Sequence, residues 1–146
     1  MTSNFGSTDS TEADVEIKRL PVQNSEELVM LRKHVRDLAV QLRLSLIDQT
    51  KLVTAVSELA RNALKYGGGG EAVLRIVRNG PRHGVRLSLI DAGPGIADLD
   101  MAMLDGFTSG GGMGLGLGGA RRLVDDFAVH TTLGVGTVVT ITKWKR

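Results

Sequence analysis

Ser57-Glu58-Leu59-Ala60-Arg61-Asn62-Ala63-Leu64 is the stretch around which the fold of this 146-residue chain is organised. Its apolar residues recur at helical spacing, and Leu52 and Val56 extend the same stripe toward the N-terminus. At about 100° per residue, Glu58 and Asn62 stack on one face, just beyond one edge of that stripe. A carboxylate and an amide oxygen placed in this way suit a magnesium site or a general base facing a cleft, with a solvated helix face as the alternative.

The elements on either side of this helix follow from periodicity, caps and turn residues. Strands are expected at 15–22, 71–78, 85–91, 128–133 and 137–144, and helices at 25–42, 46–66 and 115–127, with a long loop at 92–112 that holds one short helical piece at 99–104. The first two helices follow each other directly, and the strands come in pairs, so the elements do not alternate as in a parallel βαβ sheet. The order therefore predicts an α+β fold, a two-layer sandwich of a mixed, mainly antiparallel sheet covered on one face by about three helices.

Composition limits the function classes. The chain has no cysteine, which excludes disulfides and thiolate metal sites, and its net charge of +2 comes from scattered residues, so no nucleic-acid partner is expected. No apolar run is long enough to cross a membrane, so no membrane association is expected. The polar, Ser/Thr-rich residues 1–14 carry no signal-peptide pattern and are expected to form a disordered tail before one domain at 15–146, with a cytoplasmic location by default.

A second chemical segment ends the predicted hairpin at Leu89-Ile90-Asp91-Ala92-Gly93-Pro94-Gly95-Ile96. An acid at the end of an apolar strand is costly to bury unless it meets hydrogen-bond donors, and an adenine amino group is a donor of that kind. The spaced glycines allow backbone to approach a ligand. A simple Asp-Gly turn is the alternative.

The third segment is the glycine run from Ser109 to Gly119, which leads directly into a predicted helix. Glycine-rich backbone before a helix N-terminus favours phosphate binding. Gly114, Gly116 and Gly119 match GxGxxG, but the strand before it and the βαβ unit of a dinucleotide fold are missing, and no Walker loop is present. A flexible linker is the alternative.

In chain order, these segments resemble the boxes of the GHKL ATPase superfamily, which includes gyrase, histidine kinases and MutL and shares the Bergerat ATP-binding fold. The N box corresponds to 58–62, the first glycine box to 91–95 and the second to 112–116. Gly134-Val135-Gly136-Thr137, in the terminal hairpin, is similar to the family's last motif. Each box alone is a weak signal. Four boxes in the right order, over about residues 15–144, identify 15–146 as an ATP-binding kinase domain of this type.

The resemblance implies ATP and Mg²⁺ as cofactors, and it implies roles residue by residue. Glu58 would be the catalytic carboxylate, Asn62 the magnesium ligand, and Asp91 the acceptor of the adenine amino group. The other implied ATP-binding residues line the base pocket, surround the phosphates or support the adenine end: Gly93, Gly95, Ile96, Gly112, Met113, Gly114, Leu115, Gly116 and Thr137. Arg61 and Arg121 are candidates for phosphate contacts, and for Arg61 an ion pair with Glu58 is the alternative.

Within the superfamily, a domain of this size resembles the anti-sigma-factor serine kinases. Arg61 before Asn62 and the Gly-Leu-Gly-Leu-Gly run at 114–118 are most similar to the RsbT-type switch kinases, from whose pattern Gly119 departs because proline is frequent there. This resemblance implies a serine/threonine kinase that phosphorylates STAS-domain antagonist proteins in a stress-sensing complex. It also implies a second role, activation of a PP2C-type phosphatase by partner switching.

Two other hypotheses remain open. The chain could be an RsbW- or SpoIIAB-like anti-sigma factor that sequesters a sigma factor, with ATP setting its shape. Alternatively, the glycines are structural and no nucleotide binds. Co-purified partners separate the first hypothesis from the kinase, and a thermal shift with Mg-ATP tests the second.

Overall fold

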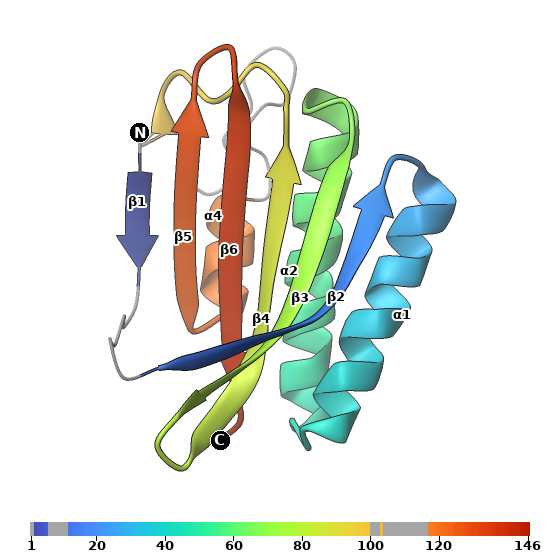
Figure 1. Ribbon diagram of the computed structural model, residues 1–146, viewed down its shortest axis with the longest axis vertical. Coiled ribbons are helices and arrows are strands. Elements are labelled where there is room, and N and C mark those ends of the chain that lie inside the picture. The colour runs from blue at the N-terminus through green and yellow to red at the C-terminus, as the bar shows by residue number, and fades with distance from the viewer. Residues whose placement is uncertain (1, 6–11, 100–102, 104–116) are drawn as a thin grey trace.

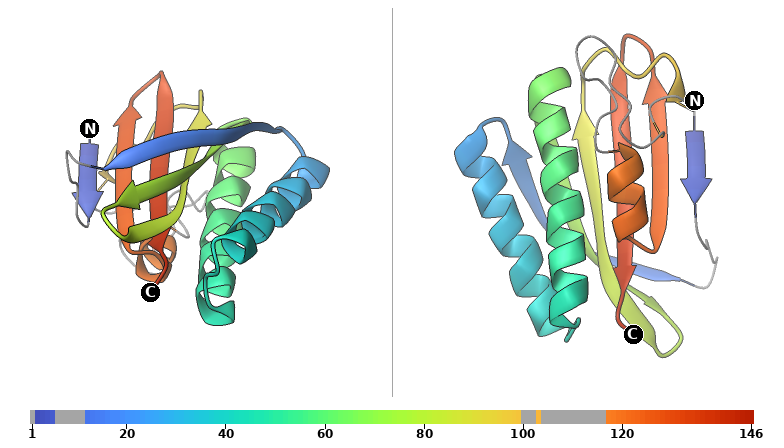
Figure 2. Two further views of the ribbon diagram at one scale, coloured as in Figure 1. Left: turned by 60° about the horizontal axis from the view of Figure 1, so that its bottom comes forward. Right: turned by 180° about the vertical axis from the view of Figure 1, so that it is seen from behind.

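The computed structural model describes residues 2–5, 12–99, 103 and 117–146. Its elements, in chain order, are β1 Thr2–Phe5, β2 Ala13–Val22, α1 Ser25–Gln41, α2 Leu46–Tyr66, β3 Gly70–Asn79, β4 Arg82–Asp91, α4 Leu117–Leu123, β5 Asp126–Thr132 and β6 Gly136–Trp144. The strands form one six-stranded sheet in the order β1-β5-β6-β4-β3-β2. Figure 1 shows α1, α2 and α4 behind this sheet, and the reverse view in Figure 2 shows them in front, so helices cover one face of the sheet and not the other. The predicted two-layer α+β sandwich is confirmed.

The long helices begin at residues whose side chains cap them. The Asn24 side chain accepts a hydrogen bond from the backbone N–H of Glu27, and the Ser45 hydroxyl accepts one from Asp48. These contacts satisfy donors that have no partner inside the helix, which stabilises each start by about 1 kcal/mol. At the other end of α2, the N–H of Gly67 bonds to the carbonyl of Ala63 and closes the helix as predicted.

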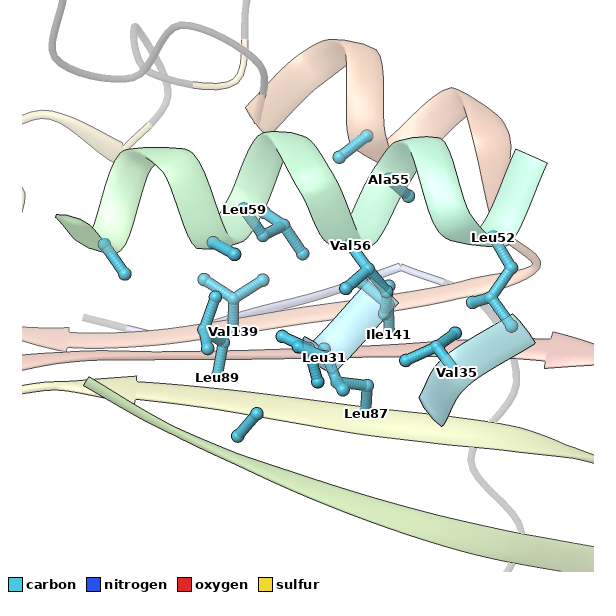
Figure 3. Close-up of a cluster of buried hydrophobic side chains, with 14 of the residues drawn as sticks. Leu31, Val35, Leu52, Ala55, Val56, Leu59, Leu87, Leu89, Val139 and Ile141 are labelled. Atoms are coloured by element: carbon cyan, nitrogen blue, oxygen red, sulfur yellow. The ribbon is translucent and has the colours of Figure 1, made fainter. Parts of the chain in front are cut away.

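Aliphatic side chains from both layers form the core. Figure 3 shows α1 and α2 meeting the covered face of β4 and β6 through the buried residues Leu31, Val35, Leu52, Val56, Leu59, Leu87, Leu89, Val139 and Ile141. Full burial of one such side chain contributes roughly 1.5–3 kcal/mol. This packing therefore fixes the position of α2 against the sheet. It also sets where the polar side chains on the other side of α2 lie.

The N-terminal region differs from the expected tail at 1–14. Thr2–Phe5 form β1, which pairs antiparallel with β5, and β2 begins at Ala13, before the predicted start at 15. Polar composition concealed β1 and the first two residues of β2, because edge strands need no buried face. Apolar and polar residues alternate at the start of β2, but the apolar ones are not buried, since Val15 and Ile17 are exposed. A register shift also interrupts the strand between Glu16 and Lys18.

Two further expectations need correction. Each of the five strand pairings is antiparallel, so the described strands give no mixed sheet. The helix expected at 115–127 spans only Leu117–Leu123 in the described residues, because Phe127 belongs to β5 and faces Ile141 of β6. A short apolar run does not distinguish helix from strand. Of the short helix expected at 99–104, Leu99 and Met103 are described, and the N–H of Met103 bonds to the carbonyl of Leu99.

Candidate functional site

A pocket opens where the C-terminal half of α2 faces the ends of β4 and β6. Its lining comes from α2, β4, the loop after β4, the first residue of α4 and β6: Leu59, Asn62, Ala63, Tyr66, Gly67, Leu89, Asp91, Pro94, Gly95, Ile96, Leu117, Thr137 and Val139. Most of this surface is apolar, with a few polar groups between. That composition is typical of a small-molecule site.

Asp91 is the charged group in this lining. It is the last residue of β4, where it pairs with Gly70 of β3 and Thr137 of β6. Its Oδ1 accepts a hydrogen bond of 2.9 Å from the backbone N–H of Gly93. The carboxylate packs against the end of α2, because a Cβ at Gly67 would lie 2.6 Å from the Asp91 Cγ. The fold thus fixes the carboxylate at the pocket wall by backbone on two sides.

The loop after Asp91 is tied to the β5–β6 hairpin by buried hydroxyls. Thr131 Oγ1 accepts the backbone N–H of Ile96 at 2.9 Å and lies 2.8 Å from Thr137 Oγ1. The N–H of Gly134 also donates to the carbonyl of Pro94 at 2.9 Å. Thr131 and Thr137 are both buried, so these bonds are shielded from water. These bonds within the protein therefore hold this half of the pocket wall in place.

Two glycines permit the close approach of the loop and the hairpin. Gly95 has φ +81°, and a Cβ there would lie 2.7 Å from the carbonyl oxygen of Thr132. Gly136 has φ +149°, and its Cβ would lie 2.1 Å from the carbonyl oxygen of Asp91. Both positions combine a left-handed backbone with contact against main chain, so only glycine fits.

Two charged residues of α2, Glu58 and Arg61, are not part of the pocket lining. Asn62 lines the pocket, whereas Glu58, one turn earlier, does not. Glu58 Oε1 is 2.8 Å from Arg61 Nη1, and the two side chains are 39% and 57% exposed. The structure therefore contains the ion pair that was one of the two alternatives for Arg61.

Several predicted residues fall elsewhere. Gly112, Met113, Gly114, Leu115 and Gly116 lie outside the described residues, as does most of the glycine run. Gly93 packs beside the pocket, because its Cβ would lie 2.6 Å from the Gly67 Cα. Arg121 lies in the last turn of α4 and is half-buried.

Sequence reasoning missed part of the lining, chiefly Tyr66 and Gly67. Tyr66 follows Asn62 by four residues, so helical stacking could have placed it on the same face. Among the described residues, its hydroxyl is the buried side-chain polar atom without a hydrogen-bond partner. Such a group costs about 1–3 kcal/mol when unsatisfied.

The described residues contain no group of three or more His, Cys, Asp or Glu side chains that could hold a metal ion. A magnesium ion bound with a nucleotide does not need one, since it takes one or two protein oxygens together with phosphates and waters. Within the same part of the chain, no helix is long and apolar enough to span a membrane.

Comparisons with known proteins agree with this geometry. Residues 47–146 match the family described as histidine kinase-, DNA gyrase B-, and HSP90-like ATPase. The serine/threonine-protein kinase RsbT of Bacillus subtilis (strain 168) is 38% identical over 120 residues, which cover 82% of this chain and 90% of that protein. The virulence sensor protein BvgS of Bordetella bronchiseptica is 32% identical over 112 residues, 66% of this chain and 9% of that one.

A solved structure supports the fold. The RsbU and RsbW domains of Rv1364c from Mycobacterium tuberculosis superpose with a TM-score of 0.58 at 21% identity. The match covers 90% of this chain and 32% of that one.

Proposed function

The chain belongs to the family of histidine kinase-, DNA gyrase B- and HSP90-like ATPases, and we propose that it is an RsbT-like serine/threonine-protein kinase that phosphorylates STAS-domain proteins with Mg-ATP. The observation that carries the proposal is 38% identity to RsbT over 90% of that protein, together with a pocket whose lining includes Asn62, Asp91, Gly95, Ile96 and Thr137.

The adenine end of ATP is proposed to enter beside Asp91. One oxygen of this carboxylate holds the Gly93 N–H, and the group still has acceptor capacity for the adenine amino group. Leu89 and Val139 supply apolar surface for the ring.

Asn62 is the residue proposed to hold the magnesium ion, through its side-chain oxygen at the pocket edge. An amide oxygen with phosphate oxygens and waters is a suitable ligand set. When bound, the ion would neutralise charge on the phosphates. The segment 112–116 is proposed to contribute phosphate contacts through backbone N–H groups.

Glu58 is proposed as the general base. Its carboxylate would accept the proton of a serine or threonine hydroxyl while that oxygen forms a bond to the γ-phosphorus and the bond to ADP breaks. The ion pair with Arg61 holds Glu58 on the solvent side of α2, where a protein substrate could reach it. Partner switching with a PP2C-type phosphatase and a cytoplasmic location are part of the same proposal.

The test has two arms. Affinity purification from the native cell should recover STAS-domain proteins and a phosphatase, and labelled phosphate should pass from ATP to the STAS protein. Glu58→Gln and Asn62→Ala should abolish the transfer, whereas Glu26→Gln, an exposed acid on α1, should leave it unchanged. Full transfer by both site variants, or recovery of a sigma factor in place of the STAS protein, would contradict the proposal.

A further inference from the structure

Two arginines lie side by side on the face of the sheet without helices, away from the nucleotide pocket. Arg75 of β3 and Arg86 of β4 are directly opposite in the antiparallel register. Like charges directly opposite each other destabilise a sheet. An anion between the two guanidinium groups offsets this repulsion.

The anions come from the chain's own N-terminal segment. Asp14 bridges the pair, with Oδ1 3.3 Å from Arg75 Nε and Oδ2 3.2 Å from Arg86 Nη1. Glu12 forms a second ion pair with Arg86 Nη1. Only 10% of the Glu12 side chain and 17% of the Arg86 side chain are exposed, so this contact is largely removed from water.

Hydroxyl groups of the neighbouring strands fix the direction of both guanidinium groups. Arg75 Nη1 donates to Ser88 Oγ at 3.2 Å, and Arg86 Nε donates to Thr142 Oγ1 at 2.8 Å. Ser88 Oγ lies in turn 2.9 Å from Thr140 Oγ1. The remaining donors of the two arginines can thus point outward to carboxylates, in the geometry that arginine forks favour. The site is built into the sheet and does not depend on flexible surface chains alone.

The two halves of β2 are held in different ways. Toward its end, Val22 is fully buried, and Arg19 bonds to Glu16 and to Glu71, two contacts that raise the pKa of its guanidinium. Residues 13–18, by contrast, are all exposed. In Figure 1 this first half crosses the face without helices in front of β3 and β4. Backbone pairing with β3 and the carboxylates of Glu12 and Asp14 hold its start there.

We propose that Arg75 and Arg86 form a docking site for an extended acidic segment of a partner protein, a site that the chain's own Glu12 and Asp14 occupy in its absence. The resident segment shows the chemistry that the site accepts: two carboxylates at positions i and i+2 of an extended strand. A partner strand with this spacing would replace both the ion pairs and the backbone pairing with the edge of β3, which is recognition by strand addition. Before Leu20 the segment has no buried apolar side chain.

The test uses the full chain and a fluorescent peptide with the sequence of residues 8–18, followed by anisotropy. Glu12→Gln with Asp14→Asn opens the site, and this variant should bind the peptide at least about tenfold more tightly than the wild type does. Adding Arg75→Gln and Arg86→Gln should remove binding, and so should a control peptide with Gln and Asn at the two acidic positions. Equal binding by the wild-type and opened chains, or binding that survives the arginine substitutions, would overturn the proposal.

A second measurement uses the wild-type chain, so it tests the proposal even if the opened variant does not fold. In the wild-type chain, excess peptide should increase hydrogen exchange of the amides at 13–16, because it displaces them from β3, whereas the control peptide should not. Unchanged exchange at saturating peptide would contradict displacement. The readout is binding alone, so the result is independent of kinase activity.

Discussion

The pocket wall around Asp91 and the helix face around Glu58, just outside the pocket, are held by different kinds of contact. Around Asp91, the loop is fixed by buried hydroxyls, short backbone bonds and glycines that touch main chain. On the helix face around Glu58, that carboxylate forms an exposed ion pair with Arg61. The region around Asp91 is preorganised, so substitutions there disturb the contacts that hold it. The region around Glu58 is positioned by the packing of the apolar side of α2.

This difference separates the expected effects of mutation. Changes near Asp91 should alter folding and nucleotide affinity together, since the same contacts serve both. Changes at Glu58 and Arg61 should leave stability nearly untouched, because exposed ion pairs contribute at most about 1 kcal/mol. Their effects should appear in phosphoryl transfer alone.

The largest effect is expected from Glu58→Gln. Loss of a general base lowers the rate by roughly 10²–10⁴-fold, while the affinity for ATP should stay within about twofold of the wild type. Single-turnover transfer to the STAS substrate and calorimetric ATP binding measure the two quantities. A parallel loss of ATP affinity would show that Glu58 takes part in nucleotide binding, and the two regions would then not differ in role.

Gly95→Ala tests the region around Asp91. The left-handed backbone and the overlap with the Thr132 carbonyl should lower the free energy of unfolding by about 2 kcal/mol or more and weaken ATP binding. Gly119→Ala is the matched control, because a Cβ there meets nothing within 4 Å in α4. Denaturant unfolding of both variants should show loss for the first and no loss for the second. Equal stabilities would mean that the loop is not held as described.

A smaller effect is expected from Thr131→Val, which keeps the shape of the side chain and removes its hydroxyl. The N–H of Ile96 and the hydroxyl of Thr137 would each lose a buried partner. We expect a loss of about 1–3 kcal/mol in unfolding free energy and weaker ATP binding. Thr132→Val, at an exposed neighbouring position, should change neither.

The smallest change in stability is expected from Arg61→Ala. The exposed pair with Glu58 should contribute no more than about 0.5 kcal/mol to unfolding. Transfer kinetics then separate the two alternatives for Arg61. A reduced rate at unchanged stability would favour a phosphate contact, whereas an unchanged rate would leave only the ion pair.

The sequence was most informative where local patterns and chemistry coincide. Helix caps at Asn24 and Ser45 and the hairpin ending in Asp91 were predictable, since each depends on neighbouring residues. The meeting of Asn62, Asp91 and Thr137 at one pocket was predictable only from the order of motifs, because no local pattern brings three distant segments together.

Long-range contacts explain what was missed. β1 and the start of β2 are polar edge strands whose order depends on distant partners, β5 for one and Arg86 for the other. Phe127 matched a helical period, yet pairing with Ile141 places it in β5. The arginine pair at 75 and 86 carries no sequence signal, because it exists only through the register of β3 and β4.

Calorimetric titration of ATP into the wild type and into Asp91→Asn tests the central claim most directly. The substitution keeps the shape of the side chain but replaces a carboxylate acceptor with an amide. We expect the wild type to bind ATP. Because a charged hydrogen bond contributes about 1.5–3 kcal/mol, the variant should bind ATP with an affinity weaker by roughly 10- to 100-fold. Equal affinity of the two proteins, or no binding of ATP by the wild type, would contradict a nucleotide site at Asp91.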